Sequence, residues 1–210
     1  MVLRVARGLL GVLVVVAIVH QLALVVELPG SPVFRFFCFF TTESNLFAAV
    51  VLLLGAVRPE RSRRRDGLRG ASVLFILITG IVYLIIVTTT NQTLGGASHW
   101  VNAVLHIVMP IALPLDWLAF PPSERIDRRR ALRWLSVPIA YFFFSIGRGF
   151  FAEWYPYPFL DPGRAGGYSG VFITGAIMLL VMAGIAWLVA AAGDLRRRGG
   201  GTAGPATTLP

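Results

Sequence analysis

Four phenylalanines lead directly into a run of polar residues in Phe36-Phe37-Cys38-Phe39-Phe40-Thr41-Thr42-Glu43-Ser44-Asn45-Leu46. The segment lies inside an apolar run as long as a membrane-spanning helix, so its polar part, residues 41–45, would lie at membrane depth. Polar and ionisable groups at that depth face the interior of a helix bundle and find partners there. The segment therefore predicts a bundle of helices with a polar centre, and another part of the chain must supply the partner.

The composition places the whole chain in a membrane. Hydrophobic residues make up 56% of the chain and charged residues 14%, and the mean hydropathy is +0.74. A soluble domain carries about 25% charged residues. The apolar runs are continuous, whereas the strands of a membrane β-barrel alternate between apolar and polar residues. We therefore predict an all-α, polytopic membrane protein.

Six apolar runs are long enough to cross a bilayer, which takes about 20 residues each. The predicted spans cover residues 5–26, 34–57, 70–90, 99–120, 134–151 and 168–192. The first run is too long for the h-region of a signal peptide and lacks a cleavage motif, so we expect it to stay as a span. The predicted organisation is a six-helix transmembrane domain over residues 1–198, followed by a disordered tail over residues 199–210 that is rich in Gly, Thr and Pro.

The basic residues indicate the orientation of the chain in the membrane. All 19 are arginines, and only Arg35, Arg148 and Arg164 fall on the side opposite the N-terminus. The positive-inside rule then places both termini in the cytoplasm. Because the arginines lie in short loops between spans, nucleic acid is not an expected partner. The composition, rich in Arg, Gly, Ala and Val, suggests a bacterial plasma membrane, and the single cysteine, Cys38, excludes an intrachain disulfide.

Three polar side chains on different spans are predicted to lie at one depth. Thr41 and His106 each lie seven residues in from the outer end of their spans, and His20 lies seven residues before Glu27 on the first span. At 1.5 Å per residue, each is about 10 Å below the outer boundary of the bilayer. His106 is therefore the predicted partner of the polar cluster around Thr41.

The spacing within each helix places an amide beside these groups. Thr41 and Asn45 are four residues apart, as are Asn102 and His106, so each pair shares one face of its helix. Pro110 lacks the N–H that would bond to the carbonyl of His106, which predicts an irregular helix and a freed carbonyl at this depth.

Two charged side chains belong to the same polar layer. Glu43 points away from the face of Thr41 and is a candidate partner for Arg148 or His20. Arg148, on the fifth span, lies nearer the surface, and its guanidinium would suit the carboxylate of a fatty acid.

A threonine hydroxyl opposite a histidine imidazole is a minimal nucleophile–base pair. His106 would take the proton of the Thr41 hydroxyl, Thr41 would attack an ester carbonyl, and the acyl-threonine would then be hydrolysed. Asn45 or Asn102 would orient the histidine or donate to the oxyanion. Two other interpretations stay open. The polar residues could serve only as hydrogen-bonding contacts between helices, or His20 and His106 could be the axial ligands of a haem.

Three motifs resemble those of one known family. The similar segments are His99-Trp100-Val101-Asn102-Ala103-Val104-Leu105-His106 with Pro110 after it, and Trp154-Tyr155-Pro156-Tyr157-Pro158-Phe159-Leu160 in the last outer loop. They resemble the androgen-induced-gene family of six-pass membrane proteins, which includes the androgen-dependent TFPI-regulating protein. Phe40-Thr41-x-x-Ser44-Asn45 resembles the motif on the second span of its bacterial relatives.

The resemblance implies an activity and two site residues. Animal members of the family are threonine hydrolases that cleave fatty acid esters of hydroxy fatty acids, and their threonine and histidine match Thr41 and His106. Thr42 stays an alternative nucleophile, and Ala103 stands where the family carries a second histidine. We therefore expect an intramembrane hydrolase of a membrane lipid or fatty acid ester, with no cofactor and no metal. The alternative is a lipid-binding or transport protein that uses the same polar pocket without catalysis.

Overall fold

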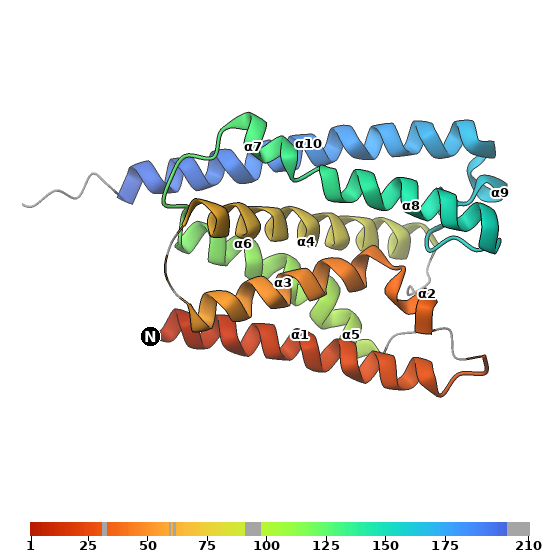
Figure 1. The fold of residues 1–210 in the computed structure, drawn as a ribbon, viewed down its shortest axis with the longest axis horizontal. Helices are drawn as coiled ribbons and strands as arrows, with labels where there is room; N and C mark the ends of the chain where they lie inside the picture. The colour runs from red at the N-terminus through yellow and green to blue at the C-terminus, as the bar shows by residue number, and fades with distance from the viewer. Residues whose placement is uncertain (31–32, 59, 61, 91–97, 201–210) are drawn as a thin grey trace, which may run out of the picture.

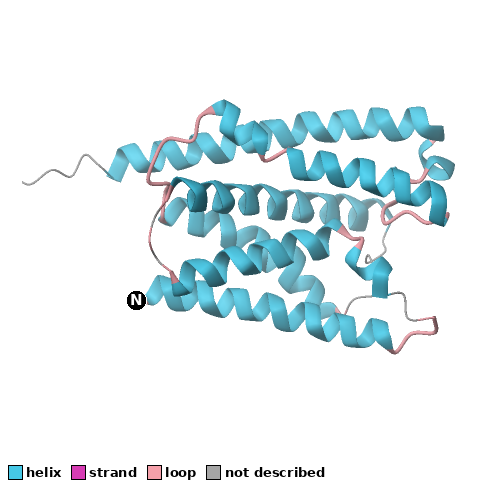
Figure 2. Ribbon diagram, in the orientation of Figure 1, coloured by secondary structure: helices cyan, strands magenta, loops and turns pink. Residues whose placement is uncertain are grey.

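The computed structural model describes residues 1–30, 33–58, 60, 62–90 and 98–200. Every regular element within these ranges is a helix, as Figure 1 and Figure 2 show. Six helical segments in the described part of the chain are long and apolar enough to cross a membrane. The predicted all-α fold with six spans is therefore confirmed. Residues 201–210 of the predicted tail lie outside the described residues, while residues 199–200 continue the last helix.

The spans lie side by side along one common direction (Figure 1). Helices α1 (Val2–Val26) and α3 (Phe40–Val57) form one side, α4 (Arg63–Thr90) runs through the middle, and α8 (Ser136–Ala152) and α10 (Gly167–Gly200) cover the other side. The N-terminus and the C-terminal end of α10 lie at the same end of the bundle, on the left of this view. An even number of spans requires that arrangement.

Small residues allow α1 and α3 to pack closely. Ala17, Ala48 and Ala49 are almost fully buried between them. Gly11 has even less room, because a Cβ there would lie 2.8 Å from the side chain of Leu53. Close backbone approach through small residues is the usual way in which membrane helices associate.

The predicted second span is interrupted near its outer end. A short helix, α2 (Val33–Phe37), is separated from α3 by two residues, so Thr41 lies in the first turn of α3 instead of the middle of a helix. Two tyrosines that are distant in the sequence form hydrogen bonds with the backbone groups at the break. The Tyr141 hydroxyl donates to the Cys38 carbonyl over 2.8 Å, and the Thr41 N–H donates to the Tyr157 hydroxyl over 3.4 Å. Nothing local in the sequence reveals these partners, which explains why the apolar pattern predicts one unbroken helix.

The third span starts earlier than predicted. Helix α4 begins at Arg63, inside the charged loop, because arginine favours helix formation where the chain is in water. Asp66, in its first turn, accepts hydrogen bonds from the backbone N–H and the hydroxyl of Ser123 at 2.7 and 2.6 Å. This contact attaches the loop after the fourth span to the start of α4.

The fourth span combines three helical pieces, α5 (His99–Ala103), a π-helical turn η2 (Val104–Val108) and α6 (Met109–Ala119). The irregularity predicted at Pro110 is thus present as a π-helical turn that ends two residues before the proline. Such turns widen the helix and often lie at functional sites. Helix α4 approaches closely at Gly80, where an added Cβ would lie 2.8 Å from the Pro110 ring.

The fifth and sixth spans are the least buried of the six. The short helix α7 (Arg128–Arg133) precedes α8, and the loop between α8 and α10 contains a 3-10 turn, η3 (Pro158–Leu160), and the short helix α9 (Pro162–Ala165). Only 22% of the membrane segment within Arg128–Ala152 and 11% of that within Gly167–Arg198 are buried within the protein. The remaining apolar surface of these two helices is available to lipid.

A network of ion pairs joins the helices near the end that holds the N-terminus. Arg7 contacts one carboxylate oxygen of Asp116 at 2.6 Å, and Arg69 contacts the other at 2.9 Å. All three side chains are only 12–13% exposed. Asp116, which lies outside the predicted outer polar layer, is therefore explained as a paired structural charge.

Candidate active site

The structure brings Thr41 and His106 together. Thr41 Oγ1 lies 3.4 Å from His106 Nε2, across the contact between α3 and the fourth span. His106 is 9% exposed and Thr41 is half-buried. A hydroxyl and an imidazole nitrogen at this distance have the arrangement of a resting nucleophile and its base, a contact that commonly shortens in a substrate complex.

The tautomer of His106 follows from its second ring nitrogen. His106 Nδ1 lies 3.2 Å from the backbone carbonyl of Asn102, one turn earlier. A carbonyl only accepts hydrogen bonds, so Nδ1 must carry the proton and Nε2 of the neutral ring must carry the lone pair that faces Thr41. Tyr83 of α4 stacks on the imidazole, with 4.0 Å between the ring centroids and 21° between the planes. Asn102 thus orients the base through its main chain, and Tyr83 fixes the plane of the ring.

Two neighbours on α3 hold the backbone of Thr41. Asn45 donates its amide to the Thr41 carbonyl over 2.9 Å, so its N–H group is directed at the main chain and not at the histidine. Ser44 reaches the same carbonyl at 3.3 Å and also bonds to Thr79 of α4 at 2.9 Å. Thr42 is only 4% exposed, and the hydroxyl that lies 3.4 Å from His106 Nε2 is that of Thr41, which distinguishes Thr41 as the nucleophile.

Tyr157 is the site residue that the sequence analysis did not single out. Its hydroxyl oxygen lies 3.5 Å from Thr41 Oγ1 and accepts the Thr41 N–H, and its side chain is 5% exposed. The available signal was its position between Pro156 and Pro158, since two prolines restrict the backbone on both sides of one aromatic residue. Tyr83 was missed as well, because a tyrosine in an apolar span has no distinctive pattern.

Three other candidates lie away from the pair. His20 is exposed on α1 and packs against Trp100, with 5.1 Å between the ring centroids. Arg148 donates to the Trp154 carbonyl over 3.2 Å and stacks on the same residue's ring. Glu43 is exposed in the first turn of α3, and among the described residues it forms no ion pair with Arg148 or His20. The pairing expected for Glu43 is therefore absent from the structure.

An apolar cavity of about 230 Å³ opens beside Thr41, between α4, α8 and α10. Thr41, Tyr83 and Tyr157 line it, whereas His106 does not. A second apolar cavity of about 300 Å³ continues between α4 and α10. The two cavities share five lining residues, Ile78, Val82, Phe159, Met178 and Met182.

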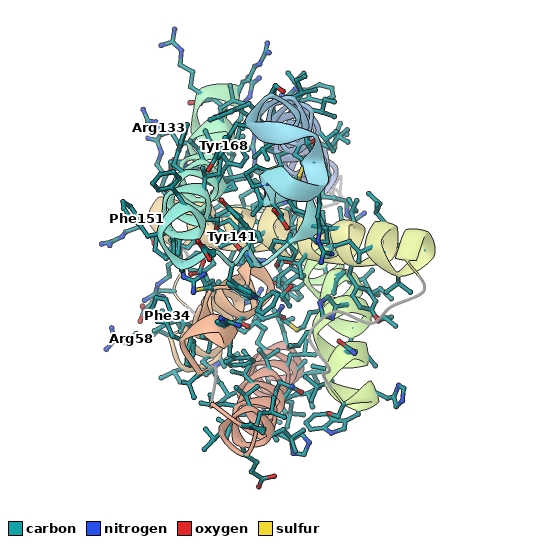
Figure 3. The ribbon with its side chains drawn as sticks, turned by 90° about the vertical axis from the view of Figure 1, so that its right-hand side faces the viewer. Phe34, Arg58, Arg133, Tyr141, Phe151 and Tyr168 are labelled. Carbon is teal, nitrogen blue, oxygen red and sulfur yellow. The ribbon has the colours of Figure 1, made fainter. Side chains whose placement is uncertain are left out.

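The first cavity is open towards the lipid. Phe143 of α8 and Phe172 of α10 line it and are 60% and 49% exposed. Figure 3 shows the end of the bundle at which the site lies, with Tyr141 on the inner side of α8 and Phe151 turned outward. A hydrocarbon chain in the bilayer could therefore reach Thr41 without passing through water.

The arrangement of the histidines does not favour haem ligation. Both ring nitrogens of His106 already face polar partners, Thr41 and Asn102, and His20 lies on an exposed side of α1. Within the described ranges, no three His, Cys, Asp or Glu side chains are grouped so that they could hold a metal ion.

Comparison with known proteins gives no match among family models, curated proteins or solved structures. The function must therefore be argued from the site.

Proposed function

We propose that this protein is an intramembrane threonine hydrolase of lipid esters, with Thr41 as the nucleophile and His106 as the base. One observation carries the proposal. Thr41 Oγ1 lies 3.4 Å from the unprotonated nitrogen of His106, at the edge of an apolar cavity that is open to lipid. Thr41 lines this cavity together with Tyr157, whose hydroxyl lies 3.5 Å from Thr41 Oγ1.

The reaction would proceed in two acyl-transfer steps. His106 Nε2 takes the proton of Thr41 as the Thr41 oxygen bonds to the ester carbonyl carbon. The ester C–O bond then breaks, and the leaving alcohol takes the proton from His106. In the second step His106 takes a proton from water, the hydroxide attacks the acyl-threonine, and the carboxylic acid leaves as Thr41 recovers its proton.

The cavities indicate what kind of ester would bind. Their lining is almost entirely aliphatic and aromatic, and the cavity at Thr41 shares five lining residues with a second apolar cavity, so the two together offer room for long hydrocarbon chains. An ester that joins two alkyl chains fits this shape better than an acetylated polar molecule does. Fatty acid esters of hydroxy fatty acids, which the resemblance to the androgen-induced-gene family implies, are such esters. A bacterial plasma membrane with both termini in the cytoplasm would place the site in the outer half of the bilayer.

A non-catalytic lipid-binding or transport role is the second candidate. The same cavity favours it, because an apolar cavity open to the bilayer would bind a lipid whether or not Thr41 reacts. The two functions differ in one respect that can be measured, which is whether the hydroxyl of Thr41 is activated.

Labelling with an alkyl fluorophosphonate tests for that activation. The full-length protein in membranes would be compared with Thr41→Ala, His106→Ala and Thr42→Ala. The last is a matched control, because Thr42 is a buried threonine next to Thr41 in the chain while the hydroxyl contact with His106 is made by Thr41. We expect labelling to be lost in the first two variants and kept in the third. Loss in Thr42→Ala alone would move the nucleophile to Thr42. If the folded wild-type protein is not labelled and hydrolyses no long-chain ester, the hydrolase proposal is wrong and the binding or transport role is favoured.

Filling the cavity tests the class of substrate. Ala176 of α10 lines the cavity, whereas Ile173 on the same helix is 62% exposed to lipid and does not line it. We expect Ala176→Phe to slow hydrolysis of long-chain esters more than that of short-chain esters, and Ile173→Phe to leave both unchanged. Equal loss for all chain lengths in Ala176→Phe would contradict binding of the acyl chain in this cavity.

A further inference from the structure

Tyr157 is held more rigidly than a loop tyrosine normally is. Its ring stacks on Phe159 with 5.2 Å between centroids and an interplanar angle of 7°, and it meets Phe39 edge-on at 5.8 Å. Prolines stand on both sides of it in the chain. Packing and backbone restriction therefore fix the position of its hydroxyl before any substrate arrives, which is the condition for a preorganised hydrogen-bond donor.

The hydroxyl of Tyr157 lies within hydrogen-bond distance of two atoms of Thr41. The Thr41 N–H donates to the Tyr157 oxygen over 3.4 Å, so the phenol proton must point elsewhere. Thr41 Oγ1, 3.5 Å away, is an acceptor within reach, and it stays one while its own proton is directed at His106 Nε2. When Thr41 donates its own proton to His106 Nε2, the phenol can donate to Thr41 Oγ1.

We propose that Tyr157 is the oxyanion donor of the hydrolase. The inference rests on the function proposed above. When Thr41 Oγ1 bonds to a carbonyl carbon, the negative oxygen that forms is two bonds from Oγ1, within hydrogen-bond reach of a donor that already faces Oγ1. Thr41 and Tyr157 line the same cavity, while His106 does not. The substrate carbonyl would therefore meet the phenol on the cavity side, and the base would act from behind.

Burial supports the role of donor. Burial raises the pKa of the Tyr157 phenol above its ordinary value, so the hydroxyl keeps its proton at physiological pH and cannot act as a base. A neutral phenol is a suitable partner for an oxyanion in a medium of low polarity. The first turn of α3, which carries Thr41, adds the positive end of a helix dipole at the same place.

The test compares Tyr157→Phe with wild type in the full-length protein, using a long-chain ester as substrate. The control is Tyr155→Phe in the same loop, whose ring packs on Gly149 and does not line the cavity. We expect kcat to fall about 10²- to 10³-fold in Tyr157→Phe, as for loss of one oxyanion donor, with KM changed by less than about threefold and Tyr155→Phe close to wild type.

A second readout separates catalysis from support of the fold. An alkyl trifluoromethyl ketone would add to Thr41 and form an oxyanion, whereas a fatty acid would bind in the cavity without forming one. We expect Tyr157→Phe to weaken binding of the ketone by a factor similar to the loss in kcat and to leave binding of the fatty acid unchanged. Equal weakening of both ligands, or an unchanged kcat, would overturn the role of Tyr157. Such a result with an active, Thr41-dependent wild type would leave the proposed hydrolase in place, whereas an inactive wild type would end both proposals.

Discussion

At the level of single residues, the surroundings distinguish the candidate pair from ordinary contacts between helices. Ser44 and Thr79 also bond to each other across two helices, but both are buried, and their other hydrogen bonds go to backbone carbonyls of their own helices. That contact is a hydrogen bond that joins helices, as the alternative interpretation expects. Thr41 differs because its hydroxyl oxygen lies 3.4 Å from an imidazole nitrogen that can take up its proton.

The stacking of Tyr83 on His106 gives a prediction at this scale. Replacing Tyr83 by leucine removes an aromatic contact in which the ring centroids are 4.0 Å apart. Such a pair contributes about 0.5–1.5 kcal/mol beyond the burial of its surface. We expect Tyr83→Leu to lower the hydrolysis rate about three- to tenfold, because the imidazole would no longer be held in one plane. Steady-state kinetics would measure this, and Tyr83→Phe, which keeps the ring, should restore most of the rate. If the phenylalanine variant were as slow as the leucine variant, the phenol and not the stacking would be the important group.

At the level of helices, the sequence predicts more of the fold than of the site. Apolar run lengths place all six spans. The i to i+4 spacing predicted the Asn102 amide beside His106, whereas the contact in the structure is with the Asn102 backbone carbonyl. The break before α3 was not predicted, because the tyrosines that form hydrogen bonds with its backbone come from elsewhere in the chain. Tyr141 lies on α8, and Tyr157 lies in the loop that follows it. The π-helical turn was predicted only as an irregularity, since Pro110 shows that a bond is missing but not how the helix adjusts.

The contact between α4 and the fourth span predicts the effect of one added methyl group. A Cβ at Gly80 would lie 2.8 Å from the rigid Pro110 ring, just after the turn that carries His106. We expect Gly80→Ala to destabilise the protein by about 1–3 kcal/mol and to lower activity by displacing His106 from Thr41. Thermal unfolding in detergent and ester hydrolysis would measure both effects. Gly147→Ala on α8 is the matched control, because nothing lies within 4 Å of its added Cβ. Equal stability of the two variants would contradict the close contact.

At the level of the whole molecule, the two ends of the bundle have different roles. The end with the N-terminus carries the buried network of Arg7, Asp116 and Arg69, which holds helices together. The other half carries the loop with Tyr157, the cavity and the Thr41–His106 pair. Depth counting from the sequence predicted the polar layer, but not the cavity, because a cavity is formed by the way in which α4, α8 and α10 pack and not by any one of them.

The orientation of this bundle in the membrane is a prediction that the arginines support and that labelling can test. Cys38 is the only cysteine and is buried, so a Cys38→Ala background allows single cysteines to be placed at either end. Glu124 and Arg164 are suitable sites, with side chains 58% and 72% exposed. If both termini are cytoplasmic, a membrane-impermeant maleimide on intact cells should label Arg164→Cys, and should label Glu124→Cys only after lysis. The reverse pattern would place the site in the cytoplasmic half of the bilayer, where its substrate would have to come from the inner leaflet.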